Sequence, residues 1–164
     1  MPYKEYITEV PDFPKEGVNF KDISPLLLNE DAFRGSIVEL GDMVKLPDYW
    51  VGIDARGFII ASALSVYFGG GIIMCRKSSK LPGRKMTYSY RTEYSSDELA
   101  MHTGTGNVVI VDDVLATGGT LRAANILSVA AGYNVIDNLV LLDLKYVPRI
   151  KDFQYNPKSL IQYE

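Results

Sequence analysis

The segment of residues 108–121 constrains the fold more than any other part of the chain. Its sequence, VVIVDDVLATGGTL, begins with four β-branched residues, continues with two adjacent acids and enters a turn of small residues. β-branched residues favour a buried strand, and the residues after the turn have helical spacing. The sequence therefore predicts a strand that ends at Asp112 and Asp113 and a helix that opens at residues 117–120.

The turn at residues 117–120 has the composition of a phosphate cradle. A helix N-terminus leaves backbone N–H groups unpaired, and such groups bind anions. The turn lacks the lysine of a Walker loop and the spacing of a dinucleotide fingerprint, so it suits a terminal monophosphate. An ordinary strand–helix turn is the alternative, and the turn alone does not separate the two.

The acid pair favours a ligand. Carboxylates at Asp112 and Asp113 can accept hydrogen bonds from the vicinal hydroxyls of a sugar. Neighbouring acids repel each other, and they are tolerated when they are exposed or when a ligand or cation lies beside them. A solvated strand end explains one aspartate better than two. A sugar phosphate therefore fits the whole segment.

Composition narrows the class of protein. A chain of 164 residues predicts one domain that buries roughly 70% of the unfolded surface. The 17 basic and 20 acidic residues give a net charge of −3, which argues against binding nucleic acid through its phosphates. The single Cys75 excludes an intrachain disulfide and fits a reducing, cytoplasmic setting. The single His102 argues against a histidine-based metal site.

No membrane segment is expected. The first 12 residues are polar, unlike a secretory signal. Residues 57–75 carry no charge, but three glycines at 69–71 interrupt them. A helix of about 12 residues followed by a buried strand explains this stretch better than a membrane span.

Apolar runs alternate with helical patterns along the chain. Strands are expected at residues 49–54, 72–75, 107–112 and 135–144, and helices at residues 33–44, 58–68 and 121–131, the first capped by Asn29 or Asp31. This alternation predicts an α/β domain with a central parallel sheet flanked by helices.

Three other segments lack a clear period. Residues 1–24 are expected to be irregular apart from an extended piece at 18–23, and the tail after Tyr146 to be polar with a short apolar piece at 160–161. Residues 81–96 combine proline, glycine, tyrosines and mixed charge. We expect them to form a mobile excursion or β-ribbon outside the core.

Polar residues follow the predicted strands. Ligands of such folds gather outside the carboxyl ends of the strands. Three ends carry candidates, at residues 54–56 (DAR), 76–77 (RK) and 112–113 (DD). Parallel strands would bring these ends to one rim. Arg56, Lys77 and Lys80 could instead be ordinary surface residues.

Residues 108–121 resemble the phosphoribosyl-pyrophosphate motif of the type I phosphoribosyltransferases. Further segments resemble landmarks of the adenine phosphoribosyltransferase family: DFPKEGVNFKDISP at 12–25, GIDARGF at 52–58, RKSSKLPG at 76–83, YRTEY at 90–94 and SLIQYE at 159–164. The resemblance implies the type I phosphoribosyltransferase fold as one domain over residues 1–164. It also implies a small base-binding hood within residues 1–25 and a flexible lid at residues 81–96.

The resemblance implies a reaction and its site. The reaction transfers the phosphoribosyl group of 5-phosphoribosyl 1-pyrophosphate (PRPP) to adenine, giving AMP and pyrophosphate in purine salvage. The implied residues are Asp112 and Asp113 for the ribose, Ala116, Thr117, Gly118, Gly119 and Thr120 for the 5′-phosphate, Ala55, Arg56 and Lys77 for pyrophosphate, Asn19, Phe20 and Lys21 for adenine, and Glu93 as the catalytic acid. It further implies Mg²⁺ held mainly by PRPP without a direct protein ligand, a cytoplasmic homodimer, and neither nucleic acid nor membrane as a partner.

The chemistry of this reaction accounts for a lid. Loss of pyrophosphate builds positive charge on the ribose, as in glycoside hydrolysis, and water would intercept such a cation. A closed lid would exclude water and bring Glu93 to a purine ring nitrogen for proton exchange.

Two alternatives remain open from the sequence. Lys21 stands where the family commonly has arginine and Asn19 where it commonly has an aliphatic residue, so hypoxanthine, xanthine or guanine could replace adenine. The other alternative is a regulator that binds PRPP or a nucleotide without turnover. The negative net charge and the lack of a spare domain for nucleic acid favour an enzyme.

Overall fold

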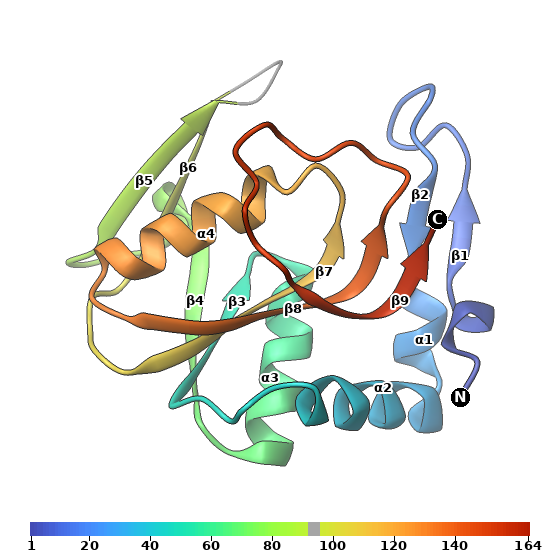
Figure 1. Cartoon of the computed structure of the whole chain (residues 1–164), viewed down its shortest axis with the longest axis horizontal. Coiled ribbons are helices and arrows are strands. Elements are labelled where there is room, and N and C mark those ends of the chain that lie inside the picture. Colours follow the sequence, from blue (N-terminus) through green and yellow to red (C-terminus); the bar gives the residue numbers. More distant parts are fainter. Residues whose placement is uncertain (92–95) are drawn as a thin grey trace.

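Strands and helices alternate through most of the chain in the computed structural model, which describes residues 1–91 and 96–164 (Figure 1). The strands are β1 (Thr8–Val10), β2 (Phe20–Asp22), β3 (Tyr49–Ile53), β4 (Gly71–Lys77), β5 (Met86–Arg91), β6 (Ser96–Met101), β7 (Asn107–Leu115), β8 (Asn134–Leu144) and β9 (Lys158–Tyr163). The helices are α1 (Ser24–Leu28), α2 (Glu30–Asp42), α3 (Arg56–Phe68) and α4 (Gly119–Ala130), with 3-10 turns η1 (Tyr3–Tyr6) and η2 (Ser78–Lys80).

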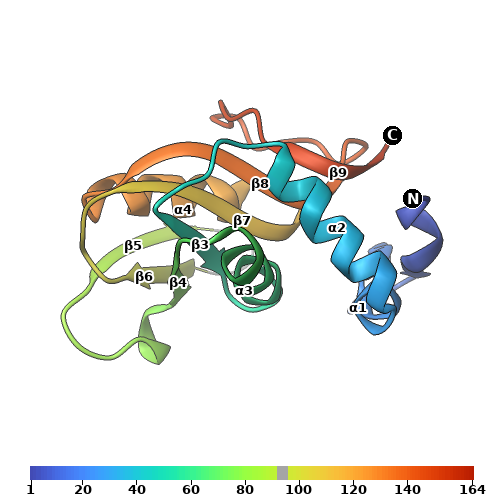
Figure 2. The same cartoon turned by 90° about the horizontal axis from the view of Figure 1, so that it is seen from below.

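A seven-stranded sheet in the order β5-β6-β4-β3-β7-β8-β9 forms the centre of the domain. Strands β4, β3, β7, β8 and β9 are parallel, and β5 and β6 join the edge in antiparallel pairing. Helices α2 and α3 cover one face and α4 covers the other (Figure 2). The predicted α/β class with a central, mostly parallel sheet is confirmed.

The middle of the sheet explains why β7 is so apolar. Val109 and Val111 belong to the core beneath α2 and α3, whereas Val108 and Ile110 belong to the core beneath α4. Successive side chains of a strand point to opposite faces, so a strand buried on both faces needs an unbroken apolar run.

The sequence correctly predicts helices α2 and α3 from residues that are close together in the chain. Asn29 caps α2, accepting a hydrogen bond from the backbone N–H of Ala32 at 2.9 Å, as predicted. The uncharged stretch 57–75 divides into α3 and β4, also as predicted. Within the described residues, no helix combines the length and apolarity needed to cross a bilayer.

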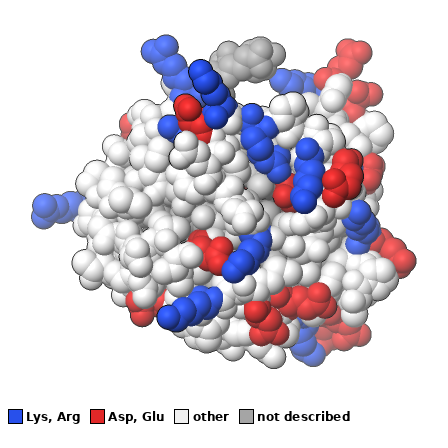
Figure 3. Space-filling view, in the orientation of Figure 1, with Lys and Arg blue, Asp and Glu red and all other residues white. Residues whose placement is uncertain are grey.

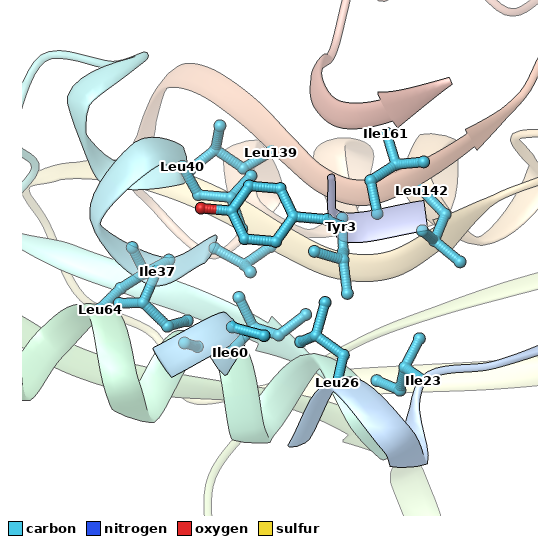
Figure 4. Close-up of a cluster of buried hydrophobic side chains, with 14 of the residues drawn as sticks. Tyr3, Ile23, Leu26, Ile37, Leu40, Ile60, Leu64, Leu139, Leu142 and Ile161 are labelled. Carbon is cyan, nitrogen blue, oxygen red and sulfur yellow. The ribbon is translucent and has the colours of Figure 1, made fainter. Parts of the chain in front are cut away.

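The expectation that residues 1–24 are irregular is wrong in part. They form η1 and the antiparallel hairpin of β1 and β2, in which Glu9 lies opposite Lys21. Tyr3, Ile23 and Leu26 pack with side chains of α2, α3, β8 and β9, which anchors this hairpin to the domain (Figure 4). The polar sequence conceals this anchoring because the contacts are distant along the chain.

Two sheet edges also differ from expectation. Strand β9 pairs in parallel with β8, although the sequence shows only a two-residue apolar piece there. Residues 86–91 and 96–101 form the β-ribbon that was one of the predicted possibilities. The expectation that residues 81–96 lie outside the core is wrong for three of them. Leu81 is buried, with 3% of its surface exposed, and Tyr88 and Tyr90 pack against the hydrophobic core. Alternation along β5 turns these tyrosines inward.

Candidate functional site

Three strand ends meet on one rim of the sheet, as the sequence predicts. The β1–β2 hairpin and the β5–β6 ribbon stand on opposite sides of this rim, with the β7–α4 turn between them (Figure 1). The basic side chains visible on this face gather mainly over its upper half, toward the rim (Figure 3). A negative net charge is thus compatible with a locally basic edge.

The turn between β7 and α4 forms a small cradle. It encloses a hollow of about 100 Å³ lined by residues 114–121 together with Asp112 and Val140. Gly118 has φ +89° and precedes the first residue of α4, Gly119. The first N–H groups of this helix have no partner inside it, so the cradle presents backbone donors to an anion.

The acid pair lies directly beside the cradle. Oδ1 of Asp112 accepts a hydrogen bond from the backbone N–H of Asp113 at 2.9 Å, and Oδ2 of Asp113 accepts one from Nε of Arg56. Burial raises the pKa of Asp112 well above its usual range, and the negative charge of Asp113 raises it further. A ligand that brings hydroxyl donors or positive charge would relieve this repulsion.

Gly57 brings the start of α3 against the acid pair. A Cβ at this position would lie 2.8 Å from the backbone oxygen of Val111 and 3.4 Å from Oδ1 of Asp112. Such distances exclude a larger residue without a shift of the backbone. The glycine after Arg56 therefore explains how that arginine reaches Asp113.

Arg56 connects the acid pair to the hairpin. Its guanidinium lies 5.2 Å from the ring centroid of Phe20, within the range of a cation–π contact, and its side chain is 46% exposed. A half-exposed guanidinium keeps donors for an anionic ligand. The peptide bond between Asp54 and Ala55, directly before it, is cis.

A second ion pair lies at the end of β4. Nε of Arg76 lies 3.4 Å from Oδ2 of Asp54, and among the described residues these are the buried side-chain atoms without a hydrogen-bond partner. Buried polar atoms normally find partners, and here the two opposite charges offset each other without a close hydrogen bond. Lys77 is exposed one residue further on and lines a different hollow, toward the β5–β6 ribbon.

The predicted adenine residues divide between two sides of the hairpin. Phe20 faces Arg56, whereas the Lys21 ammonium lies 2.9 Å from Oε1 of Glu9 and 4.2 Å from the ring centroid of Tyr163. Asn19 donates a hydrogen bond to Oε2 of Glu9 at 2.8 Å. Only Phe20 of these three side chains is thus directed to the rim, because neighbours on a strand alternate.

The β5–β6 ribbon reaches the cradle through Tyr90. Its hydroxyl lies 3.4 Å from Oγ1 of Thr120, and burial raises its pKa. Glu93, the catalytic acid implied by the resemblance, lies outside the described residues.

Two features near the rim were not identified from the sequence. Asp22 follows Phe20 by two residues on β2, so its side chain lies on the same side of the hairpin, which faces Arg56. Hydrogen bonds from Ser24 lower the pKa of Asp22, and the charge of Arg56 lowers it further. The segment at 145–157 packs behind the cradle, where the Phe153 ring would lie 2.5 Å from a Cβ at Gly118. The polar composition of this segment gives no periodic signal. The only signal for Asp22 is its spacing of two from Phe20.

A protein-only metal centre is not evident in the described ranges. Within residues 1–91 and 96–164, no three His, Cys, Asp or Glu side chains cluster in a way that could hold a metal ion.

Known proteins are similar to this chain in sequence and in fold. Residues 43–142 match the phosphoribosyl transferase domain model. An adenine phosphoribosyltransferase of Bdellovibrio bacteriovorus is 44% identical over 165 residues, covering 99% of this chain and 100% of that protein. The structure of the Thermoanaerobacter pseudethanolicus adenine phosphoribosyltransferase superposes with a TM-score of 0.89 at 37% identity, covering 98% of each chain. The Giardia lamblia APRTase solved with 9-deazaadenine gives 0.88 at 31% identity, covering 99% of this chain and 96% of that one.

Proposed function

The chain belongs to the adenine phosphoribosyltransferase family, and we propose that it transfers the phosphoribosyl group of PRPP to adenine, releasing AMP and pyrophosphate. One observation carries this proposal. A cradle of backbone donors, an acid pair and a half-exposed arginine lie side by side on one rim. These groups match a 5′-phosphate, two ribose hydroxyls and a pyrophosphate in the order in which PRPP presents them.

We assign each part of PRPP to a group on the rim. The 5′-phosphate binds the backbone donors of residues 116–120 and the hydroxyls of Thr117 and Thr120. The carboxylates of Asp112 and Asp113 accept hydrogen bonds from the ribose hydroxyls. Arg56 turns from Asp113 to the pyrophosphate, assisted by the backbone at Ala55 and by Lys77.

The charges support this assignment. Pyrophosphate gains negative charge as it leaves, and Arg56 with Lys77 would stabilise that charge. Mg²⁺ is proposed as the cofactor, because it prefers phosphate oxygens with one or two carboxylates and several waters over an all-protein cage. When bound, it would supply further charge neutralisation at the pyrophosphate. The ion is proposed to be held mainly by oxygens of PRPP and by water, with no direct protein ligand.

The base is proposed to bind against the hairpin. Phe20 offers the aromatic face on which a purine can stack, and it lies beside Arg56. Lys21 and Asn19 would contribute through the backbone or by holding the hairpin through Glu9, since their side chains are engaged there. Glu93 is proposed to exchange a proton with the purine once residues 81–96 close as a lid.

We propose a cytoplasmic homodimer as the working form. Helix α3 exposes Val66 at 88% and Tyr67 at 58%, and with Phe33 and Ile37 of α2 these residues line a largely apolar hollow of about 430 Å³. An apolar surface of this kind fits a subunit contact. Val66→Asp should therefore shift the protein toward a monomer in sedimentation, and an unchanged mass would exclude this face.

A base panel tests the proposed reaction. The purified protein is incubated with Mg²⁺, PRPP and one base at a time, and the nucleotides are separated by chromatography. AMP from adenine, with little product from the other bases, is expected. IMP, XMP or GMP as the main product would assign the enzyme to another purine. A protein that binds PRPP without forming any nucleotide would be a regulator.

The double variant Asp112→Asn, Asp113→Asn provides the matched control. It keeps the shape of both side chains and removes their charge. Turnover should fall sharply, which excludes a contaminating enzyme as the source of AMP.

A further inference from the structure

The carbonyl groups of the cradle are held from behind by residues that follow β8. Nη1 of Arg149 donates a hydrogen bond to the backbone oxygen of Ala116. The backbone N–H of Ile150 donates to the backbone oxygen of Thr117 at 2.8 Å. Two consecutive peptide groups of the cradle are thereby fixed from one side.

Fixing these carbonyls also fixes the donors on the other side. In a planar trans peptide the C=O and the following N–H point in opposite directions. A carbonyl of Ala116 that points to Arg149 therefore directs the N–H of Thr117 away from Arg149. The same geometry at Thr117 directs the N–H of Gly118 away from Ile150. Both N–H groups belong to the turn that lines the 100 Å³ hollow.

Arg149 is itself locked in place. Its Nη2 donates to Oδ1 of Asp143 at the end of β8, and its Nη1 also donates to the backbone oxygens of Leu144 at 3.1 Å and Val147 at 3.2 Å. The planar guanidinium meets several acceptors at once, which a lysine ammonium on a flexible stem does not reproduce. One side chain thus ties the end of β8 to the turn after β7.

We propose that Arg149 is a positioning residue that orients the 5′-phosphate cradle and thereby sets the affinity for the phosphate end of PRPP. This inference rests on the proposed function, since it takes the cradle to be the 5′-phosphate site. Arg149 does not touch the donor. It acts through the peptide group between Ala116 and Thr117, and the positive charge behind that carbonyl strengthens the dipole facing the phosphate.

The experiment measures binding of the phosphate end and of the pyrophosphate end of PRPP separately. Calorimetry measures the binding of ribose 5-phosphate, which needs the cradle, and of Mg²⁺-pyrophosphate, which needs Arg56 but not the cradle. The variants are Arg149→Lys and Arg149→Met, and the same-loop control is Lys151→Met, whose side chain is exposed. Melting temperatures are recorded so that all titrations are made on folded protein.

The expected result is selective. Arg149→Met should weaken ribose 5-phosphate binding by about 10- to 100-fold, the loss that follows from displaced donors, and should leave pyrophosphate binding within about twofold. Arg149→Lys should fall between wild type and Arg149→Met, and Lys151→Met should match wild type. In turnover, KM for PRPP should rise more than kcat falls.

Other outcomes would overturn the inference. Equal losses for ribose 5-phosphate and pyrophosphate would mean that Arg149 only holds the fold together. Unchanged ribose 5-phosphate binding in a folded Arg149→Met variant would mean that the cradle keeps its shape without it. A wild-type protein that binds neither probe would instead reject the proposed function, which distinguishes the two failures.

Discussion

Arg56 and Asp113 are hydrogen-bonded to each other, although 57 positions separate them in the chain. One is the proposed ligand of pyrophosphate and the other the proposed ligand of a ribose hydroxyl. In the absence of donor each therefore satisfies the other, which limits the penalty of a half-buried charge. Donor binding would exchange this single pair for contacts to two ends of one ligand.

Replacing Arg56 should weaken the binding of PRPP. Arg56→Gln removes the charge that pyrophosphate requires, and hydrogen bonds to charged groups contribute about 1.5–3 kcal/mol. The dissociation constant for PRPP should therefore rise about 10- to 100-fold in calorimetry. Lys45→Gln is the control, because it also removes one positive charge and Lys45 is exposed after the end of α2. Equal PRPP affinity in the two variants would exclude a role for Arg56 in the donor site.

Asp112 should lower the stability of the donor-free protein. Its pKa is raised in the folded state by burial and by Asp113. Between the ordinary carboxyl pKa of the unfolded chain and the raised pKa, the folded protein binds more protons than the unfolded chain, so stability falls as pH rises. Asp112→Asn removes this penalty. The variant should melt higher than wild type at pH 8, by about 2–4 °C for each 1 kcal/mol relieved.

The pH series distinguishes this effect from ordinary repacking. The difference between Asp112→Asn and wild type should shrink as pH falls toward 4, where both folded and unfolded carboxyls are increasingly protonated. Asp152→Asn, at an exposed position after β8, should show no such trend. A gain in melting temperature that is independent of pH would contradict the proposed cause. PRPP affinity should fall in Asp112→Asn despite the gain in stability.

Gly118 should tolerate no side chain. Its φ of +89° is left-handed, and a Cβ would lie 2.5 Å from the Phe153 ring. Gly118→Ala combines a left-handed alanine with overpacking and should lose about 2–4 kcal/mol in urea unfolding. Gly17→Ala has a similar φ of +86° with no atom within 4 Å of the new Cβ, and should lose about 1–2 kcal/mol. Equal losses would show that Phe153 gives way freely.

Phe20 should contribute to the binding of adenine and not to the binding of PRPP. Stacking of a base on an aromatic ring contributes about 1–3 kcal/mol, so Phe20→Ala should raise KM for adenine about 5- to 100-fold. Binding of PRPP, measured without base, should change by less than about threefold. A PRPP affinity that falls as much as the adenine affinity would place Phe20 in the donor site through its contact with Arg56.

Glu93 should govern turnover. Positioned general acids and bases typically contribute about 10²–10⁴-fold, so Glu93→Gln should lower kcat by that range. Calorimetry should find PRPP binding largely retained. Glu98→Gln, which removes a carboxylate from β6, is the control. A fully active Glu93→Gln enzyme would remove its catalytic role.

The sequence revealed the elements whose causes are local. The apolar run of residues 108–111 and the Asn29 cap of α2 depend on neighbours along the chain, and both lie where they were expected. The predicted strand end at Asp112 and Asp113 is wrong, because β7 continues to Leu115 through its pairing with β8. The β1–β2 hairpin, β9 and the inward tyrosines of β5 were missed because distant partners stabilise them. Their sequences are too short or too polar to show a period.

The same division holds for the site. The sequence by itself determined the class of fold, and it predicts a phosphate site at the β7–α4 turn from the acid pair and the small-residue helix start. Only the tertiary structure decided that Arg56 pairs with Asp113 and that Arg149 holds the cradle from behind. It also decided that Lys21 forms an ion pair with Glu9, whereas Phe20 faces the rim. The physical reason is distance along the chain. A hydrogen bond or ion pair depends on where two side chains meet in space, and neither residue alone encodes its partner.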